Sequence, residues 1–128
     1  MALERPDIDP PEGAPPADLE IVDLVVGDGP EAQAGRTVSV HYAGVAFSTG
    51  EEFDASWNRG REFRFGLGQG QVITGWDRGV AGMRVGGRRR LVIPPRLAYG
   101  DRGAGGVIAP GETLIFVVAL VDVVEGPS

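Results

Sequence analysis

One short stretch near the middle of the chain, Val72 to Met83, constrains the fold more than any other part of the sequence. Trp76, Val80 and Met83 recur there at the spacing of one helix face. Thr74 stands where the side chain of a helix N-cap is expected. The stretch also contains three glycines, each of which costs a helix about 1 kcal/mol relative to alanine. A helix this weak must be held by its surroundings, so we expect one short helix with Trp76 at its contact with the rest of the protein.

The remainder of the chain is typical of β-strands. Alternating apolar and polar residues predict strands over 19–26, 37–47, 61–67, 88–93 and 113–124, with a further short strand near 53–56 and a loop over 57–60. Both faces of the last strand are apolar, which predicts a central strand buried on both sides. The short connections favour antiparallel pairing. We therefore predict an α+β domain of five or six strands that clasp one short helix.

The sequence indicates one domain preceded by a tail. Residues 1–18 contain five prolines and scattered acids with few large apolar groups. Such a segment buries too little surface to offset the entropy of ordering it, so we expect a disordered tail, with a proline-rich docking segment as the alternative. Residues 19–126 are expected to form the folded domain. A chain of 128 residues has room for one ordinary domain and not for two.

The composition excludes several chemistries. The chain has no cysteine, and all 12 basic residues are arginine, so thiol nucleophiles, thiolate metal sites and catalytic lysines are absent. A single histidine, His41, cannot form a histidine metal cluster. We therefore expect no cofactor and no metal. A net charge of −6 argues against nucleic acid as a partner. No apolar run approaches the roughly 20 residues of a membrane span and no secretory pattern is visible, so we expect a cytoplasmic protein.

Three features invite functional interpretations that the residues support poorly. The glycine tract 66–70 lacks the third glycine of a dinucleotide motif, because position 71 is Gln71, and it is better interpreted as a turn. The triplet 88–90 is a candidate phosphate site, but in an acidic protein a solvated strand edge is favoured. His41 points away from the face of Tyr42, which favours a surface histidine paired across strands. Dinucleotide or nucleic-acid binding would rest on the first two features alone.

Several motifs occur together and in order: His41-Tyr42-x-Gly44, Phe53-Asp54-x-Ser56, Val72-Ile73-x-Gly75-Trp76, Leu97-Ala98-Tyr99-Gly100 and Leu114-x-Phe116. Over residues 19–124 the chain resembles the FKBP-type peptidyl-prolyl cis–trans isomerases. The resemblance implies a five- to six-stranded antiparallel sheet curled around one short α-helix. It also implies a shallow aromatic pocket that takes a proline ring.

The resemblance further implies roles for individual residues of such a pocket. Trp76 would form the floor, and the walls and apolar lining would come from Tyr42, Phe53, Phe63, Val72, Ile73 and Phe116, with Tyr99 and Ile108 at the two ends of a mobile loop. The backbone N–H of Ile73 and the hydroxyl of Tyr99 would donate to substrate carbonyls. Asp54 would pair with Arg59 and the Tyr42 hydroxyl at the pocket edge. From the sequence alone, a turn aspartate that caps local backbone is the alternative for Asp54.

We therefore expect an isomerase that assists protein folding by binding X–Pro segments of peptides and unfolded proteins. The catalytic groups would be Asp54, Tyr99 and the N–H of Ile73. Macrolides such as tacrolimus or rapamycin are expected ligands, and the protein is expected to be a monomer. The alternative is a non-catalytic module or holdase that uses the same pocket to bind proline segments or macrolides.

Overall fold

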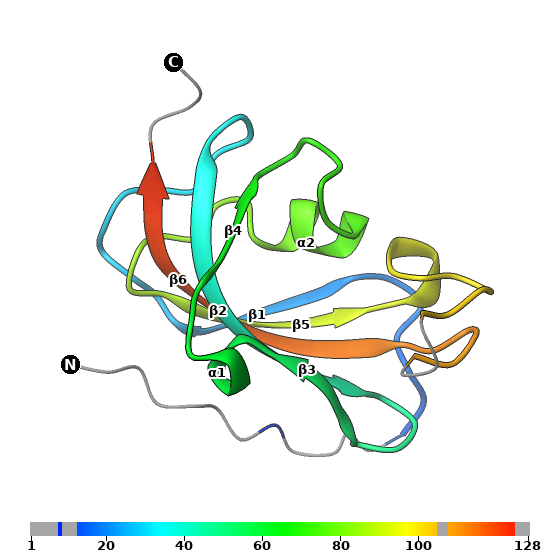
Figure 1. Ribbon diagram of the computed structural model, residues 1–128. Helices are drawn as coiled ribbons and strands as arrows, with labels where there is room; N and C mark the ends of the chain where they lie inside the picture. Colours follow the sequence, from blue (N-terminus) through cyan, green and yellow to red (C-terminus); the bar gives the residue numbers. More distant parts are fainter. Residues whose placement is uncertain (1–7, 9–12, 105–107, 125–128) are drawn as a thin grey trace.

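The computed structural model describes residues 8, 13–104 and 108–124 of the chain. One antiparallel sheet dominates the described part (Figure 1). Its six strands are β1 (Glu20–Val25), β2 (Thr37–Ala46), β3 (Glu52–Ala55), β4 (Phe63–Gly66), β5 (Arg88–Ile93) and β6 (Leu114–Val124). The strand order is β1-β5-β6-β2-β3. Strand β4 also pairs with β2: β4 lies beside the first residues of β2, from Thr37 to Val40, and β3 lies beside its later residues, from Ala43 to Val45.

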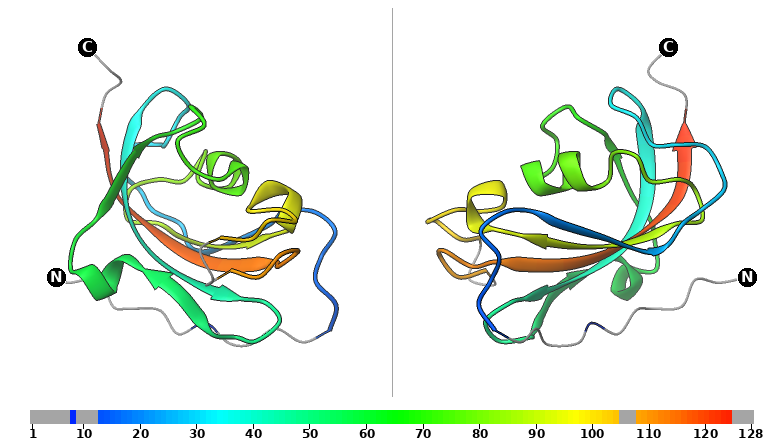
Figure 2. Two further views of the ribbon diagram at one scale, coloured as in Figure 1. Left: turned by 45° about the vertical axis from the view of Figure 1, so that its right-hand side comes forward. Right: turned by 180° about the vertical axis from the view of Figure 1, so that it is seen from behind.

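The sheet curls around one short helix, α2 (Thr74–Gly79), which lies in its concave side (Figures 1 and 2). The predicted α+β class and antiparallel sheet are confirmed. Two further single turns occur, α1 (Ser56–Arg59) and the 3₁₀ helix η1 (Pro95–Leu97). The expectation of a plain loop over 57–60 is therefore wrong. A helix of four residues has no apolar period that a sequence pattern could reveal, and it ends at Gly60 with a left-handed φ of 67°.

Strand β6 lies in the middle of the sheet, as its two apolar faces predict. Every residue from Leu114 to Leu120 is at most 4% exposed. One face packs with α2 in the main core, and on the opposite face Ile115 joins Val45 and Val92 in a second cluster. This second cluster defines the outer face of the sheet, against which Phe47 and Ile8 also pack.

The glycines of α2 allow the helix to lie directly on β5. A Cβ at Gly75 would lie 2.5 Å from the Ile93 side chain, and one at Gly79 would lie 2.8 Å from Leu91. Both glycines therefore serve close packing, which offsets their poor helix propensity. The expected cap at Thr74 is not formed, because Ile73 occupies the N-cap position and no side chain caps the helix.

The triplet 88–90 does not lie at a sheet edge, so the prediction of a solvated strand edge is wrong. Strand β5 is flanked by β1 and β6. The Arg89 guanidinium forms an ion pair of 2.6 Å with Asp23 and donates hydrogen bonds of 2.9 Å to the carbonyls of Gly79 and Ala81. Arg89 thus satisfies carbonyls at the carboxyl end of α2, where cations are favourable, and links the helix to β1.

Of the expected tail, residues 1–7 and 9–12 lie outside the described residues, so their predicted disorder stays a prediction. Residues 13–18 contain no helix or strand. Asp18 forms an ion pair with Arg96, the middle residue of η1. The last residues of the predicted domain, 125–126, also lie outside the described part, and the division at residue 19 stays a prediction. Within the described residues, no helix has the length and apolar character needed to cross a membrane.

Candidate active site

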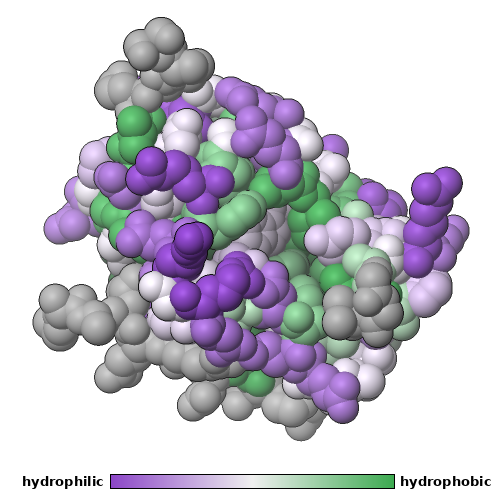
Figure 3. Space-filling view, in the orientation of Figure 1, coloured by the Kyte–Doolittle hydropathy of each residue, from purple (hydrophilic) through white to green (hydrophobic). Residues whose placement is uncertain are grey.

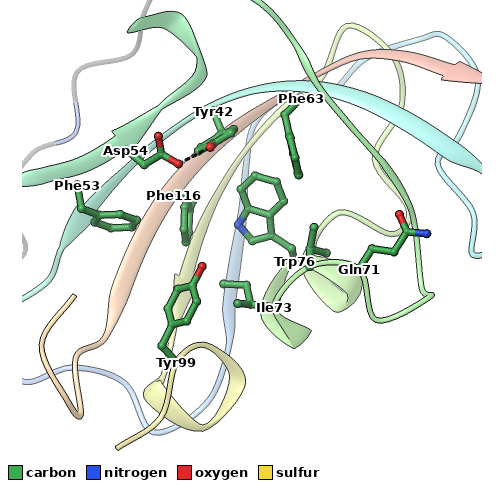
Figure 4. Close-up of a pocket in the computed structure, with 10 residues that line it drawn as sticks. Tyr42, Phe53, Asp54, Phe63, Gln71, Ile73, Trp76, Tyr99 and Phe116 are labelled. Atoms are coloured by element: carbon green, nitrogen blue, oxygen red, sulfur yellow. Dashed lines mark hydrogen bonds between the residues drawn. The ribbon is translucent and has the colours of Figure 1, made fainter. Parts of the chain in front are cut away.

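A cavity of about 270 Å³ opens between the concave side of the sheet, α2 and η1. Ten side chains from separate elements line it: Tyr42, Phe53, Asp54, Phe63, Gln71, Val72, Ile73, Trp76, Tyr99 and Phe116 (Figure 4). In the space-filling view, hydrophobic residues gather toward the middle of this face and hydrophilic residues border them (Figure 3). The cavity is thus an apolar site with a few polar groups at its edge, as ligand pockets generally are.

Aromatic rings form the floor and the walls. The Trp76 ring, which is 4% exposed, lies 4.9 Å from the ring of Tyr42, 5.2 Å from Phe116 and 6.0 Å from Phe63 between centroids, each in edge-to-face geometry. Such pairs stabilise one another by about 0.5–1.5 kcal/mol beyond the area they bury. The floor and the walls of the pocket therefore support one another.

A glycine in β2 permits this arrangement of rings. A Cβ at Gly44 would lie 2.7 Å from ring atoms of both Phe53 and Phe116. Since Cβ atoms do not approach other atoms so closely, any other residue here would push two pocket walls apart. The glycine in the sequence motif His41-Tyr42-x-Gly44 thus has a packing reason.

The polar edge of the pocket is a group of three side chains. The Tyr42 hydroxyl donates to Asp54, and the Arg59 guanidinium donates to Asp54 at 2.6 Å and to the Tyr42 oxygen at 2.8 Å. Partial burial of Asp54 favours its neutral form, but the hydrogen bonds from Tyr42 and Arg59 outweigh burial and lower the pKa of the Asp54 carboxyl. Burial, reinforced by the hydrogen bond to Asp54, raises the pKa of Tyr42. Asp54 is therefore an anion and Tyr42 a neutral donor at neutral pH.

The lowered pKa of Asp54 predicts where this group contributes to stability. A carboxyl whose pKa is lower in the folded state stabilises the fold above its unfolded pKa, near 3.9, and loses this contribution as the pH falls through the folded pKa. We expect the difference in melting temperature between wild type and Asp54→Asn to be constant above about pH 5 and to shrink below about pH 4. Thermal unfolding from pH 7 to pH 2 measures it. A difference that already shrinks near pH 6 would contradict this assignment.

The expected donors to substrate lie at the other side of the cavity. Ile73 is fixed by the start of α2, because its carbonyl accepts the N–H groups of Trp76 at 2.9 Å and Asp77 at 3.3 Å. Tyr99 follows η1, is 41% exposed, and directs its hydroxyl toward the middle of the pocket (Figure 4). One donor is thus held by a helix start and the other by a turn that reaches over the opening.

Two residues differ from the sequence expectation. Ile108, expected in the pocket wall, is not among the lining residues; it is buried in the main core, where its backbone pairs with Ala104. Gln71 lines the cavity and was missed by the sequence analysis. Its amide oxygen accepts the N–H of Gly66, so it belongs to the turn between β4 and α2. The only sequence feature that could have placed Gln71 at the cavity is its position directly before Val72 and Ile73, two expected lining residues.

The remaining expected site residues gather at the cavity. Arg59 adjoins the cavity through its contacts with Asp54 and Tyr42. The cavity is lined by the other nine: Tyr42, Phe53, Asp54, Phe63, Val72, Ile73, Trp76, Tyr99 and Phe116. His41 lies apart, hydrogen-bonded to Ser56. Among the described residues, no cluster of three or more acids and histidines has the arrangement of a metal site.

Comparison with known proteins identifies the class of protein that this fold and pocket define. A family model described as FKBP-type peptidyl-prolyl cis-trans isomerase matches residues 29–121. The chain belongs to this family, whose members catalyse cis–trans exchange of X–Pro bonds.

Individual relatives agree with this assignment. An FK506-binding protein of Streptomyces anulatus is 72% identical over 124 residues, which cover 96% of this chain and all of the relative. The peptidyl-prolyl cis-trans isomerase FPR2 of Saccharomyces cerevisiae is 54% identical over 93 residues, 73% of this chain and 69% of that protein. The crystal structure of AtFKBP13 superposes with a TM-score of 0.76 at 43% identity, covering 84% of this chain and 94% of that one.

Proposed function

We propose that the aromatic cavity binds the proline ring of an X–Pro segment and lowers the rotation barrier by excluding water and by two oriented hydrogen bonds. The observation that carries this proposal is the convergence of Trp76, Tyr42, Phe63 and Phe116 around one open cavity with polar groups only at its edge. A proline ring matches this apolar socket in chemistry and in size.

The physical basis is differential binding of the twisted amide. The planar X–Pro amide is held by resonance behind a barrier of about 18–20 kcal/mol. Resonance and its charge separation are lost in the twisted transition state, so an apolar pocket disfavours the planar ground state more. The N–H of Ile73 and the hydroxyl of Tyr99 hold the carbonyls on either side, and the Asp54 anion, fixed by Arg59, favours the rotated carbonyl. No proton transfer is needed.

The same pocket chemistry extends to ligands and clients. We propose that macrolides of the tacrolimus and rapamycin type occupy this cavity, since several relatives are named FK506-binding proteins. Clients would be proline-containing peptides and unfolded chains, whose slow X–Pro exchange limits folding. Action as a monomer in the cytoplasm completes the proposal, and size-exclusion chromatography with cell fractionation would test it.

The central test is the exchange rate of X–Pro tetrapeptides with and without the protein. We expect acceleration that is nearly flat between pH 6 and 8, insensitive to chelators and abolished by tacrolimus. Tight macrolide binding without any acceleration would instead indicate the non-catalytic binding module. Dependence on a metal ion would contradict the desolvation mechanism.

Removal of single polar groups at the pocket edge should separate catalysis from binding. Tyr99→Phe deletes one hydroxyl at the pocket opening, and Asp54→Ala deletes the anion that Arg59 and Tyr42 hold. Because one hydrogen bond contributes about 0.5–1.5 kcal/mol, and a charged one more, we expect kcat/KM to fall about tenfold for Tyr99→Phe and further for Asp54→Ala. Peptide exchange kinetics measure both.

The matched control is Asp122→Ala, which removes an exposed carboxylate on β6 that accepts the N–H of its neighbour Val123. It should leave kcat/KM unchanged. Equal activity in all three variants would contradict the proposed roles of Tyr99 and Asp54.

A further inference from the structure

Along one edge of β2, beside the pocket, the strand pairing has a gap that one buried side chain fills. Pairing with β3 ends at Ala43 on this edge, and pairing with β4 begins at Val40. Between these two ladders the backbone N–H of Tyr42 would lack a partner. The hydroxyl oxygen of Ser56, a residue with no exposed surface, accepts this N–H at 2.7 Å. Ser56 thus replaces a neighbouring strand at the residue that forms one wall of the pocket.

The short helix α1 contacts Tyr42 twice. Ser56, its first residue, holds the backbone of Tyr42, and Arg59, its last residue, holds the Tyr42 hydroxyl at 2.8 Å. The orientation of α1 therefore determines where the guanidinium meets Tyr42 and Asp54. A four-residue helix has no stability of its own, so other contacts must fix this orientation.

His41 supplies those contacts from the outer face of the sheet. Its Nδ1 atom lies 2.8 Å from the Ser56 hydroxyl, and its ring stacks on Trp57 with centroids 5.1 Å apart. The guanidinium of Arg88 lies over the same Trp57 ring, 5.9 Å from its centroid. The only histidine of the chain is thus joined to the first two residues of α1.

Counting hydrogens shows that this contact persists in either tautomer of His41. The Ser56 hydroxyl has one proton and two acceptors in reach, Nδ1 of His41 at 2.8 Å and the Tyr42 carbonyl at 3.3 Å. When Nδ1 lacks a proton, the hydroxyl donates to it. When Nδ1 carries one, it donates to the hydroxyl oxygen, which then donates to the Tyr42 carbonyl.

We propose that His41 and Ser56 are positioning residues of the isomerase: from the outer face they fix the Tyr42 peptide and α1, and so the meeting of Tyr42, Asp54 and Arg59 at the pocket edge. The inference rests on the proposed role of that group in catalysis. His41 is not among the residues that line the pocket, and it acts through Ser56 and α1.

Two substitutions of His41 separate its hydrogen bond from its stacking. His41→Phe keeps a ring on Trp57 without a nitrogen, whereas His41→Asn offers a polar atom near the place of Nδ1 without the ring. We expect His41→Phe and Ser56→Ala to lower kcat/KM about three- to tenfold, the range of one hydrogen bond, and His41→Asn to restore most of the loss. The control is Ser39→Ala, which removes another buried hydroxyl of β2 whose partner is Arg64, and which should retain full activity.

A double-mutant cycle distinguishes positioning from general destabilisation. In a Tyr42→Phe background the hydroxyl that α1 brings to Arg59 is absent, so His41→Phe should cost less than about twofold there. An equal loss in both backgrounds, or wild-type activity of His41→Phe alone, would overturn the proposal. Wild-type activity of Tyr42→Phe would contradict the proposed site instead.

A measurement on the unmodified protein covers the case in which a variant does not fold. The Ser56 hydroxyl proton lies between Nδ1 of His41 and the carbonyl of Tyr42, on a residue with no exposed surface. We therefore expect this proton to be visible in NMR spectra and protected from exchange with solvent. A Ser56 hydroxyl proton that exchanges as fast as that of an exposed serine would overturn the proposal.

Discussion

Replacing Trp76 by alanine is expected to lower the free energy of unfolding by about 3–5 kcal/mol. The indole is almost completely buried, and its ring contacts those of Tyr42, Phe63, Phe65 and Phe116. Alanine would leave a cavity where helix, sheet and pocket meet, and a helix of six residues has little stability of its own to compensate. Since a domain of this size has a stability of about 5–15 kcal/mol, this is a large fraction of it. Urea denaturation measures the change.

The matched control is the other tryptophan. Trp57 is partly exposed on the outer face, so Trp57→Ala should cost no more than about 1–2 kcal/mol. Activity gives a second readout, because Trp76→Ala also removes the floor on which the proline ring is proposed to rest. A Trp76→Ala variant as stable as Trp57→Ala would show that the helix is held by other contacts, and wild-type activity in it would contradict the proposed pocket.

Replacing Gly75 by alanine is expected to reduce stability and activity together, although alanine is the better helix former. Its Cβ would lie 2.5, 2.7 and 2.9 Å from three atoms of Ile93, a residue with no exposed surface. Overpacking of this kind costs about 1–3 kcal/mol, which exceeds the gain of about 1 kcal/mol in helix propensity. Relief of the clash must move α2 away from β5, which shifts Trp76, the next residue. We therefore expect kcat/KM to fall at least about tenfold, equivalent to about 1.4 kcal/mol.

The partner substitution Ile93→Ala provides the control, since it removes the side-chain atoms that the new Cβ would meet. Alone it should cost about 2–5 kcal/mol through the cavity it creates. In combination with Gly75→Ala the total cost should be clearly smaller than the sum, because the new methyl group occupies part of that cavity. Strictly additive costs in denaturation experiments would show that the contact between α2 and β5 is not the reason for the glycine.

Much of the fold could be predicted because its signals are local or periodic. The apolar period of Trp76, Val80 and Met83 predicts three residues that are indeed buried, although α2 ends at Gly79 and only Trp76 lies in the helix. The double apolar pattern of 114–120 predicts the central strand, since only a strand covered on both sides needs apolar residues at every position. The arginine triplet was misassigned because a sequence does not state which strand is an edge. That depends on pairing between β1 and β5, which are more than sixty residues apart in sequence.

The sequence by itself determined the strand segments, the place of α2, the absence of thiol and lysine chemistry, and the set of aromatic residues from which the pocket is built. Only the tertiary structure decided which residues share the cavity and what supports it. Ile108 is buried in the core and does not line the cavity, whereas Gln71 does. Ser56 lies in the gap of β2 beside His41. The physical reason is range. Propensity and apolar period act over a few residues, whereas the curl of the sheet and the contacts made by a four-residue helix arise from packing between distant segments.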